Sequence, residues 1–156
     1  MRTNTTAIGA VMVHRDEADS LICGTFGEFR WHLNYVTQIL GRDSYNPVGA
    51  LSMMILEDGP LFVADTQVHL HPDPTQIAEI AVGAARHVRR FGIEPKIAFC
   101  SQSQFGNQGD GSGNRLRAAI GMLDAQGHDF CYEGEMNIDT ALDPELRERL
   151  FPSNRM

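Results

Sequence analysis

Two segments near the N-terminus have apolar residues at the spacing of an amphipathic helix. The first covers residues 5–14, and the second covers residues 29–40 and is expected to stop at Gly41. Between them, the apolar run 20–23 is closed by Gly24, and its length and flank are typical of a buried strand. The apolar positions that define the two helices are Ile8, Val11 and Met12 in the first, and Phe29, Leu33, Val36 and Leu40 in the second.

Two strand-like runs follow, at residues 50–56 and 61–64. The connection between them contains Asp58–Gly59, a pair that supplies the positive φ angles of a tight hairpin. We therefore predict that these two strands are antiparallel neighbours.

The clearest helical pattern begins at Asp73. Asp73 can cap this helix, Pro74 suits its first position, and Gln76 can complete a capping box. Gly92 is expected to end the helix. One apolar stripe runs along it, formed by Ile77, Ile80, Ala81, Ala84, Val88 and Phe91.

The rest of the chain continues the alternation of strands and helices. It contains a predicted strand at 96–100, a polar, glycine-rich loop at 101–114, a helix ending at Gly127, a short strand at 130–132 and a last helix from Asp143. This order predicts an α/β fold: a three-layer α/β/α sandwich with a mostly parallel sheet and one antiparallel hairpin strand. We see no linker, so residues 1–156 are predicted to form a single lobe.

Composition narrows the classes of partner. The 156 residues are 42% hydrophobic and 21% charged, as in an ordinary soluble domain, with a net charge of −7. This acidic balance argues against nucleic-acid binding, although a local arginine cluster could still hold a small anion. No apolar run approaches the ~20 residues of a membrane span, and the start has no secretory signal pattern.

Three cysteines are far apart in the sequence: Cys23, Cys100 and Cys131. Each lies in an apolar run, so we expect buried, reduced thiols in a cytoplasmic protein. A metal site formed by His69, His71 and Asp73 is a weaker alternative to a structural role for these residues, because a zinc site needs a full ligand set. No resident metal is therefore predicted.

The loop 101–114 is the strongest candidate for chemistry. It leaves the carboxyl end of a strand and enters a helix, which is where open α/β sheets bind ligands and where helix N–H groups attract anions. Its glycines allow close approach of backbone, and Arg115 and Arg117 follow. The alternative is a flexible surface loop. The carboxylates Glu133, Glu135 and Asp139 could perform acid–base chemistry, but are expected instead to bond backbone N–H groups at a turn.

Several short segments, in order along nearly the whole chain, resemble the phosphate acetyl/butyryl transferase family, and its malic-enzyme branch in particular. The most informative are Ala64-Asp65-Thr66, Arg89-Arg90-Phe91-Gly92-Ile93-Glu94-Pro95-Lys96, Ser101-x-Ser103-x-Phe105-Gly106, and Gly134-Glu135-Met136 with Asp139. The resemblance implies an α/β/α lobe beside a cleft for coenzyme A and acyl phosphate. In the malic-enzyme branch this domain is regulatory and responds to acetyl-CoA.

The resemblance also implies which residues bind the ligand. Acetyl-CoA or phosphate, with no covalently bound cofactor, would be held by Ser101, Ser103, Gly106, Asn107, Arg115 and, after a gap, Arg30. The family's catalytic Asp-x-Ser-Arg-Gly segment is not found, and its lysine in the serine-rich loop is absent, so no catalytic residue is predicted. The alternatives are a lobe of an active phosphate acyltransferase and a dimerisation module.

A homodimer is expected as well. Family members associate through the lobe that this chain resembles. Trp31 and Tyr35 lie one turn apart on the second helix, roughly opposite Leu33 and Val36. Exposed aromatic pairs are typical of interfaces, although the pair could instead cover a sheet edge within one chain.

Overall fold

The computed structural model describes residues 4–41, 48–107 and 111–156. The chain divides into two compact units, Met1–Val48 and Gly49–Met156. The single lobe expected over residues 1–156 stays a prediction. Among the described helices, none is both long enough and apolar enough to cross a membrane.

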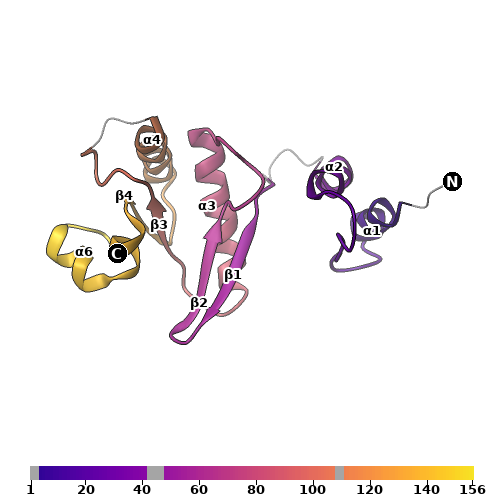
Figure 1. Ribbon diagram of the computed structural model, residues 1–156, viewed down its shortest axis with the longest axis horizontal. Helices are drawn as coiled ribbons and strands as arrows, with labels where there is room; N and C mark the ends of the chain where they lie inside the picture. The colour runs from indigo at the N-terminus through magenta and orange to yellow at the C-terminus, as the bar shows by residue number, and fades with distance from the viewer. Residues whose placement is uncertain (1–3, 42–47, 108–110) are drawn as a thin grey trace. The chain divides into compact units, whose positions relative to one another are not determined.

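The first unit is a pair of helices, α1 (Thr5–His14) and α2 (Phe29–Leu40), which pack against each other (Figure 1). Both were predicted from the sequence, and Gly41 caps α2 as expected. The side chain of Asn4 starts α1 by accepting a hydrogen bond from the backbone N–H of Ala7 at 3.0 Å.

The predicted strand at 20–23 is wrong, since these residues have no regular structure. Ile22 is 99% exposed, whereas Leu21 packs against α1, where a Cβ added to Gly9 would meet its side chain at 2.5 Å. A strand needs a hydrogen-bonded neighbouring strand, and the regular elements in the described part of this unit are helices. An apolar run indicates burial of some side chains, but not which partner covers them.

The second unit starts with an antiparallel hairpin. Strands β1 (Leu51–Leu56) and β2 (Gly59–Ala64) pair from Leu51 opposite Ala64 to Leu56 opposite Gly59, which confirms the predicted hairpin. Gly59 has a φ of +123°, a conformation that favours glycine, whereas Asp58 keeps a negative φ. The glycine alone therefore supplies the left-handed residue of the turn.

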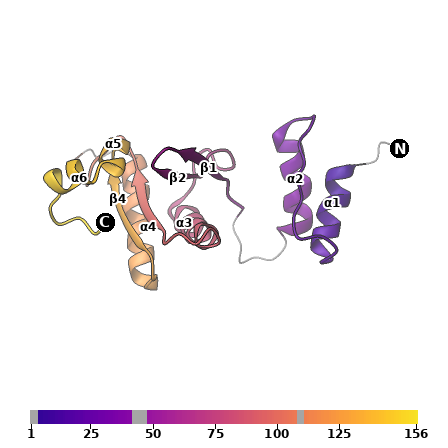
Figure 2. The ribbon, with the colours of Figure 1, turned by 90° about the horizontal axis from the view of Figure 1, so that it is seen from below.

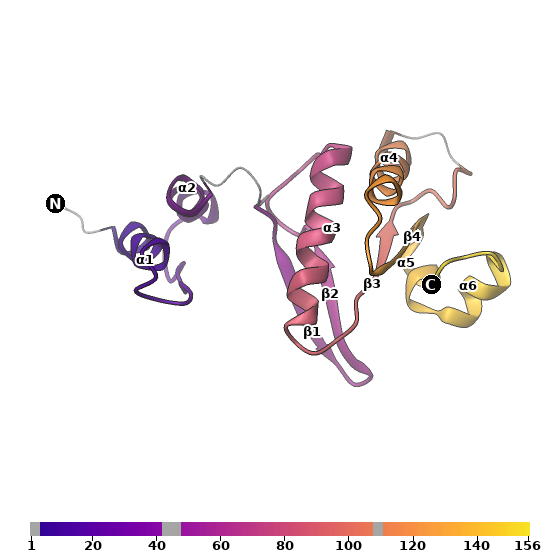
Figure 3. The same ribbon diagram turned by 180° about the vertical axis from the view of Figure 1, so that it is seen from behind.

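Helix α3 (Pro74–Arg89) follows the hairpin and confirms the predicted capping box. The Asp73 carboxylate accepts from the backbone N–H of Gln76 at 2.9 Å, and the Gln76 side chain accepts from the backbone N–H of Asp73 at 3.0 Å. Figure 3 shows α3 lying along the hairpin, and α3 also packs against the next helix, α4 (Gly111–Gln126).

Two parallel strands form the second sheet. Strand β3 (Lys96–Cys100) pairs with β4 (Cys131–Met136), and α4 connects them and lies beside them, as Figure 2 shows. Two short helices complete the unit, α5 (Ile138–Leu142) and α6 (Pro144–Leu150). Helix α4 begins earlier than the sequence pattern indicated, and α5 was not predicted.

The core of this unit lies between the two long helices and the parallel strands. It consists of Ala78, Ala81, Ala85, Phe99, Ala119, Ile120, Leu123, Phe130 and Tyr132. Small residues on α3 face larger ones on α4 and the strands, so the elements can approach closely. This core fixes the carboxyl ends of β3 and β4, where the candidate site lies.

The sheet differs from the single, mostly parallel one expected. The described strands form two separate pairs, one antiparallel and one parallel. Alternation of strands and helices indicates the type of connection, but it does not determine which strand edges meet. The class, α/β, is as predicted.

Candidate functional site

The candidate site lies at the carboxyl edge of the parallel pair. Cys100 and Met136 are register partners at the ends of β3 and β4, and the backbone N–H of Ser101 donates to the Met136 carbonyl at 2.9 Å. The loop 101–107 leaves this edge, and α4 begins at Gly111. The position is the one at which α/β proteins bind ligands.

One buried carboxylate organises this loop. The Oε1 atom of Glu135 accepts hydrogen bonds from the Ser103 hydroxyl at 2.6 Å, the Gly106 backbone N–H at 2.9 Å and the Arg117 guanidinium at 2.5 Å. Glu135 is 0% exposed. Its other oxygen, Oε2, is buried and has no hydrogen-bond partner among the described residues.

The surroundings favour the ionised form of Glu135. Burial by itself raises the pKa of its carboxyl group. The hydrogen bonds from Ser103, Gly106 and Arg117 outweigh that penalty, so the pKa of Glu135 lies below its usual value. The cluster thus pairs a carboxylate, whose charged form is favoured, with the guanidinium of Arg117.

The predicted ligand residues fall into two groups. Ser103 is fully buried and Gly106 donates its N–H to Glu135, so both are engaged within the protein. Ser101 and Asn107 lie in the same loop with solvent access. The Ser101 hydroxyl accepts from the Ser103 backbone N–H at 3.2 Å, and the side-chain Oδ1 of Asn107 accepts from the Gln104 backbone N–H at 2.9 Å. The structure therefore brings these four together.

The two arginines after the loop have different surroundings. The Arg117 side chain is 35% exposed and bonds both Glu135 and the Asn114 side chain. Arg115 is partly exposed on the first turns of α4, and its Nη1 atom would lie 3.8 Å from a Cβ on Gly111 at the helix start. Arg115 is thus the better placed of the two to meet a ligand at the helix N-terminus.

Sequence reasoning noticed Glu135 and Arg117 but missed their pairing. Glu133 and Asp139 do bond backbone N–H groups, of Gly134 and Thr140, as expected for the carboxylate cluster. Glu135 instead reaches across to the loop and to α4. The position of Glu135 in the Gly134-Glu135-Met136 segment was the sequence feature that could have pointed to its role.

Loop 101–107 has further anchors. The Phe105 backbone N–H donates to the Glu135 carbonyl at 2.7 Å, and the Phe105 ring lies 4.2 Å from that of Phe151, centroid to centroid. The Gln104 amide donates to the Thr140 hydroxyl at 3.4 Å. The described loop residues are therefore held from several directions.

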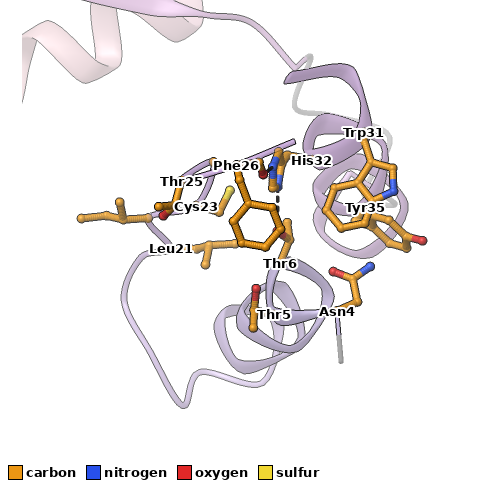
Figure 4. Close-up of a pocket in the computed structure, with 12 residues that line it drawn as sticks. Asn4, Thr5, Thr6, Leu21, Cys23, Thr25, Phe26, Trp31, His32 and Tyr35 are labelled. Carbon is orange, nitrogen blue, oxygen red and sulfur yellow. Dashed lines mark hydrogen bonds between the residues drawn. The ribbon is translucent and has the colours of Figure 1, made fainter. Parts of the chain in front are cut away.

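The first unit contains a hollow of about 540 Å³, drawn in Figure 4. His32 spans it, with Nε2 2.9 Å from the Phe26 carbonyl and Nδ1 2.8 Å from the Thr6 hydroxyl. The carbonyl can only accept, so Nε2 of His32 donates to it, and in the neutral imidazole Nδ1 accepts from the Thr6 hydroxyl. Arg30, predicted as a ligand residue, is exposed on α2 and does not line this hollow.

The alternative metal site receives no support. His69 bonds Asp65, with Nδ1 2.7 Å from Oδ2, and the described residues contain no group of three or more metal-binding side chains. The three cysteines are free thiols, as expected, but the prediction that they are buried is wrong for Cys23 and Cys100, which are exposed. Cys23 lies in the segment that has no strand partner, and Cys100 at the end of β3.

The family model described as phosphate acetyl/butaryl transferase matches residues 1–156. The chain belongs to this family.

The proteins that this chain is similar to include malic enzymes. The chain is 43% identical over 152 residues to the NADP-dependent malic enzyme of Salmonella typhimurium, and the match covers 97% of this chain and 20% of that enzyme. It is 30% identical to the phosphate acetyltransferase of Synechocystis, over 97% of this chain and 22% of that enzyme. The chain thus spans about a fifth of the length of these relatives.

Two solved structures of phosphotransacetylases have a similar fold. The phosphotransacetylase from Streptococcus pyogenes superposes with a TM-score of 0.83 at 24% identity, over 97% of this chain and 47% of that one. The EutD phosphotransacetylase from Staphylococcus aureus gives 0.80 at 22% identity, over 98% and 48%. These matches establish an α/β fold of the phosphotransacetylase type.

Proposed function

We propose that this chain is an acyl-CoA- or phosphate-binding lobe of a bacterial malic enzyme, with a regulatory role. The observation that carries the proposal is the ordered loop 101–107 at the carboxyl edge of the β3–β4 pair, next to the start of α4. The similarity to malic enzymes supports the proposal that the parent protein is a malic enzyme. The similarity to a phosphate acetyltransferase supports acyl-CoA or phosphate as the class of ligand.

The ligand's phosphate would meet the accessible part of the loop. Ser101 and Asn107 offer polar side chains there, and Arg115 offers a positive charge beside the N-terminus of α4. Ser103 and Gly106 would support the loop without contacting the ligand, because both already donate hydrogen bonds to Glu135. Arg30 belongs to the other unit, and its role as a ligand residue stays a prediction.

Calorimetric titration tests this function. Inorganic phosphate and acetyl-CoA are titrated separately into the 156-residue chain, into Arg115→Ala and into a control, Arg149→Ala, which removes an exposed arginine from α6. We expect saturable binding that weakens about tenfold in Arg115→Ala, equivalent to ~1.4 kcal/mol, and not in the control. Absence of binding by the unaltered chain would refute the proposal.

The alternative of an active acyltransferase lobe has its own readout. Formation of acetyl-CoA from acetyl phosphate and coenzyme A by the purified chain would favour it over a regulatory role. The resemblance-based expectation is no turnover, because the catalytic Asp-x-Ser-Arg-Gly segment is not found in this sequence.

We also propose a two-fold symmetric homodimer. Trp31 is 44% exposed and its ring packs edge-on against the half-buried Tyr35 with centroids 5.0 Å apart, so the two aromatic rings are in contact. Such a surface suits an interface core. Light scattering should give twice the chain mass, and Trp31→Ala should shift it towards the monomer. A monomer at micromolar concentration would contradict the dimer.

We also infer the layer arrangement and the location of the protein. We infer that the two strand pairs belong to the central layer of a three-layer α/β/α sandwich, supported by the TM-scores of 0.80 and 0.83 with phosphotransacetylases. We infer a cytoplasmic location from the three free cysteines.

A further inference from the structure

Glu135 connects three separate segments of the second unit. It belongs to β4, its carboxylate accepts from Ser103 and Gly106 in the loop, and the same oxygen accepts from Arg117 on α4. Its backbone takes part as well, because the Glu135 carbonyl accepts from the N–H of Phe105 at 2.7 Å. Glu135 therefore holds the loop through its own backbone carbonyl and through its side-chain carboxylate.

Burying the Glu135 carboxylate is a costly way to stabilise the fold. A buried carboxylate is tolerated only when it is paired and hydrogen-bonded, and a well-packed apolar cluster of similar size is often at least as stable. Here Glu135 is 0% exposed, and its Oε2 atom still has no partner among the described residues. Buried polar atoms without a partner are rare in folded proteins and call for an explanation other than packing.

The geometry suggests that the Glu135 carboxylate serves to order the donors around it. Oε1 of Glu135 receives donors that an anion would otherwise attract: a hydroxyl, a backbone N–H at a residue with a φ of +85°, and a guanidinium. Ser103, Gly106 and Arg117 are bonded to Glu135, whereas Asn107 is exposed on the loop and the Arg115 side chain lies beside the N-terminus of α4.

We propose that Glu135 is a positioning residue for the anion site: it fixes loop 101–107 and Arg117 from the interior, so that the ligand meets a preformed surface at Asn107 and Arg115. This inference rests on the proposed function, since it concerns the same site. A preformed surface improves affinity because the loop does not have to be ordered when the ligand arrives.

The experiment compares Glu135→Gln with Glu133→Gln. Glu133 is a matched control because it is a buried carboxylate on the same strand that bonds the backbone of Gly134 and Arg155 and no residue of the loop. Dissociation constants for inorganic phosphate and for acetyl-CoA are measured well below the melting temperature of each variant. Hydrogen exchange of the Gly106 amide is followed by NMR in the absence of ligand.

We expect Glu135→Gln to weaken phosphate binding about tenfold or more, the usual cost of losing an orienting partner, and to speed exchange of the Gly106 amide. Glu133→Gln should leave the phosphate constant within about twofold. A purely structural role for Glu135 would lower the melting temperature but leave the phosphate constant of the folded protein unchanged. If Glu135→Gln does not fold, Ser103→Ala, which removes one donor and keeps the carboxylate, should show both effects to a smaller extent.

The outcomes separate the two proposals. If the unaltered chain binds phosphate or acetyl-CoA and Glu135→Gln binds equally well or more tightly, the role of Glu135 is wrong and the proposed function stands. If the unaltered chain binds neither, the proposed function is wrong, and the site that Glu135 would position is lost with it.

Discussion

The Oδ2 atom of Asp65 lies 2.7 Å from Nδ1 of His69 and 2.8 Å from the backbone nitrogen of the same residue. The Oδ1 atom of Asp65 accepts from the backbone N–H groups of Ala50, at 3.0 Å, and Val68, at 3.2 Å. One carboxylate thereby fastens the turn after β2 to the residue before β1. Burial raises the pKa of Asp65, but these hydrogen bonds outweigh it and lower the pKa to about 2.

Replacing Asp65 with asparagine should destabilise the second unit. The amide would direct a donor group at backbone donors, leaving partly buried N–H groups without an acceptor, at a cost of about 2 kcal/mol in the free energy of unfolding. Urea unfolding followed by circular dichroism measures it. Asp58→Asn, in the exposed hairpin turn, is the control and should change stability by less than ~0.5 kcal/mol.

Asp65 should also make stability depend on pH. Because its folded-state pKa is lowered from 3.8 to about 2, its contribution is fully present above pH 3.8 and is lost as the pH falls towards 2. The difference corresponds to roughly 2 kcal/mol. Unfolding free energies measured across this range should therefore fall more steeply for the unaltered chain than for Asp65→Asn. Parallel curves would contradict the assignment.

Arg117 and Arg115 should have separable effects. Removing one partner of a buried ion pair costs about 3–5 kcal/mol, and the partial exposure of Arg117 reduces the expected loss in Arg117→Ala to roughly 2 kcal/mol. Arg115→Ala should leave the unfolding free energy within ~0.5 kcal/mol and weaken phosphate binding instead. Chemical unfolding of both variants decides this, and equal destabilisation would place Arg115 in the structural cluster.

Leu123 should be the costliest leucine to truncate on α4 and α6. It is 0% exposed within the core cluster, so Leu123→Ala should lower the free energy of unfolding by about 2–5 kcal/mol through lost burial and a cavity. Leu150→Ala, at an exposed position on α6, is the matched control and should cost far less. Similar midpoints in urea for the two variants would show that the core is not where the structure puts it.

The capping box of α3 predicts a smaller effect. Asp73→Ala removes the acceptor for the Gln76 N–H and should cost about 1 kcal/mol in thermal or urea unfolding. Glu79→Ala, exposed on the same helix, tests whether the change is due to the cap and should be close to neutral. A neutral Asp73→Ala would mean that the first turn of α3 is held by packing alone.

The sequence determined the features whose partners are close along the chain. Asp73 and Gln76 are three residues apart, so the cap of α3 could be read directly from the residue types. The hairpin likewise depends on a short connection containing Gly59. The loop at the end of β3 was predicted because it lies between a strand pattern and a helix pattern, both of which are local.

Only the tertiary structure decided the interior of the site. Ser103 and Arg117 are 32 and 18 residues from Glu135, and no periodicity relates them, so the cluster exists only once β3 and β4 pair and α4 packs beside them. The same reason explains the apolar run at 20–23, which has strand character but pairs with no strand among the residues that the structure describes. Local preferences select the elements, whereas the contacts between distant elements determine which side chains become buried, charged and ordered.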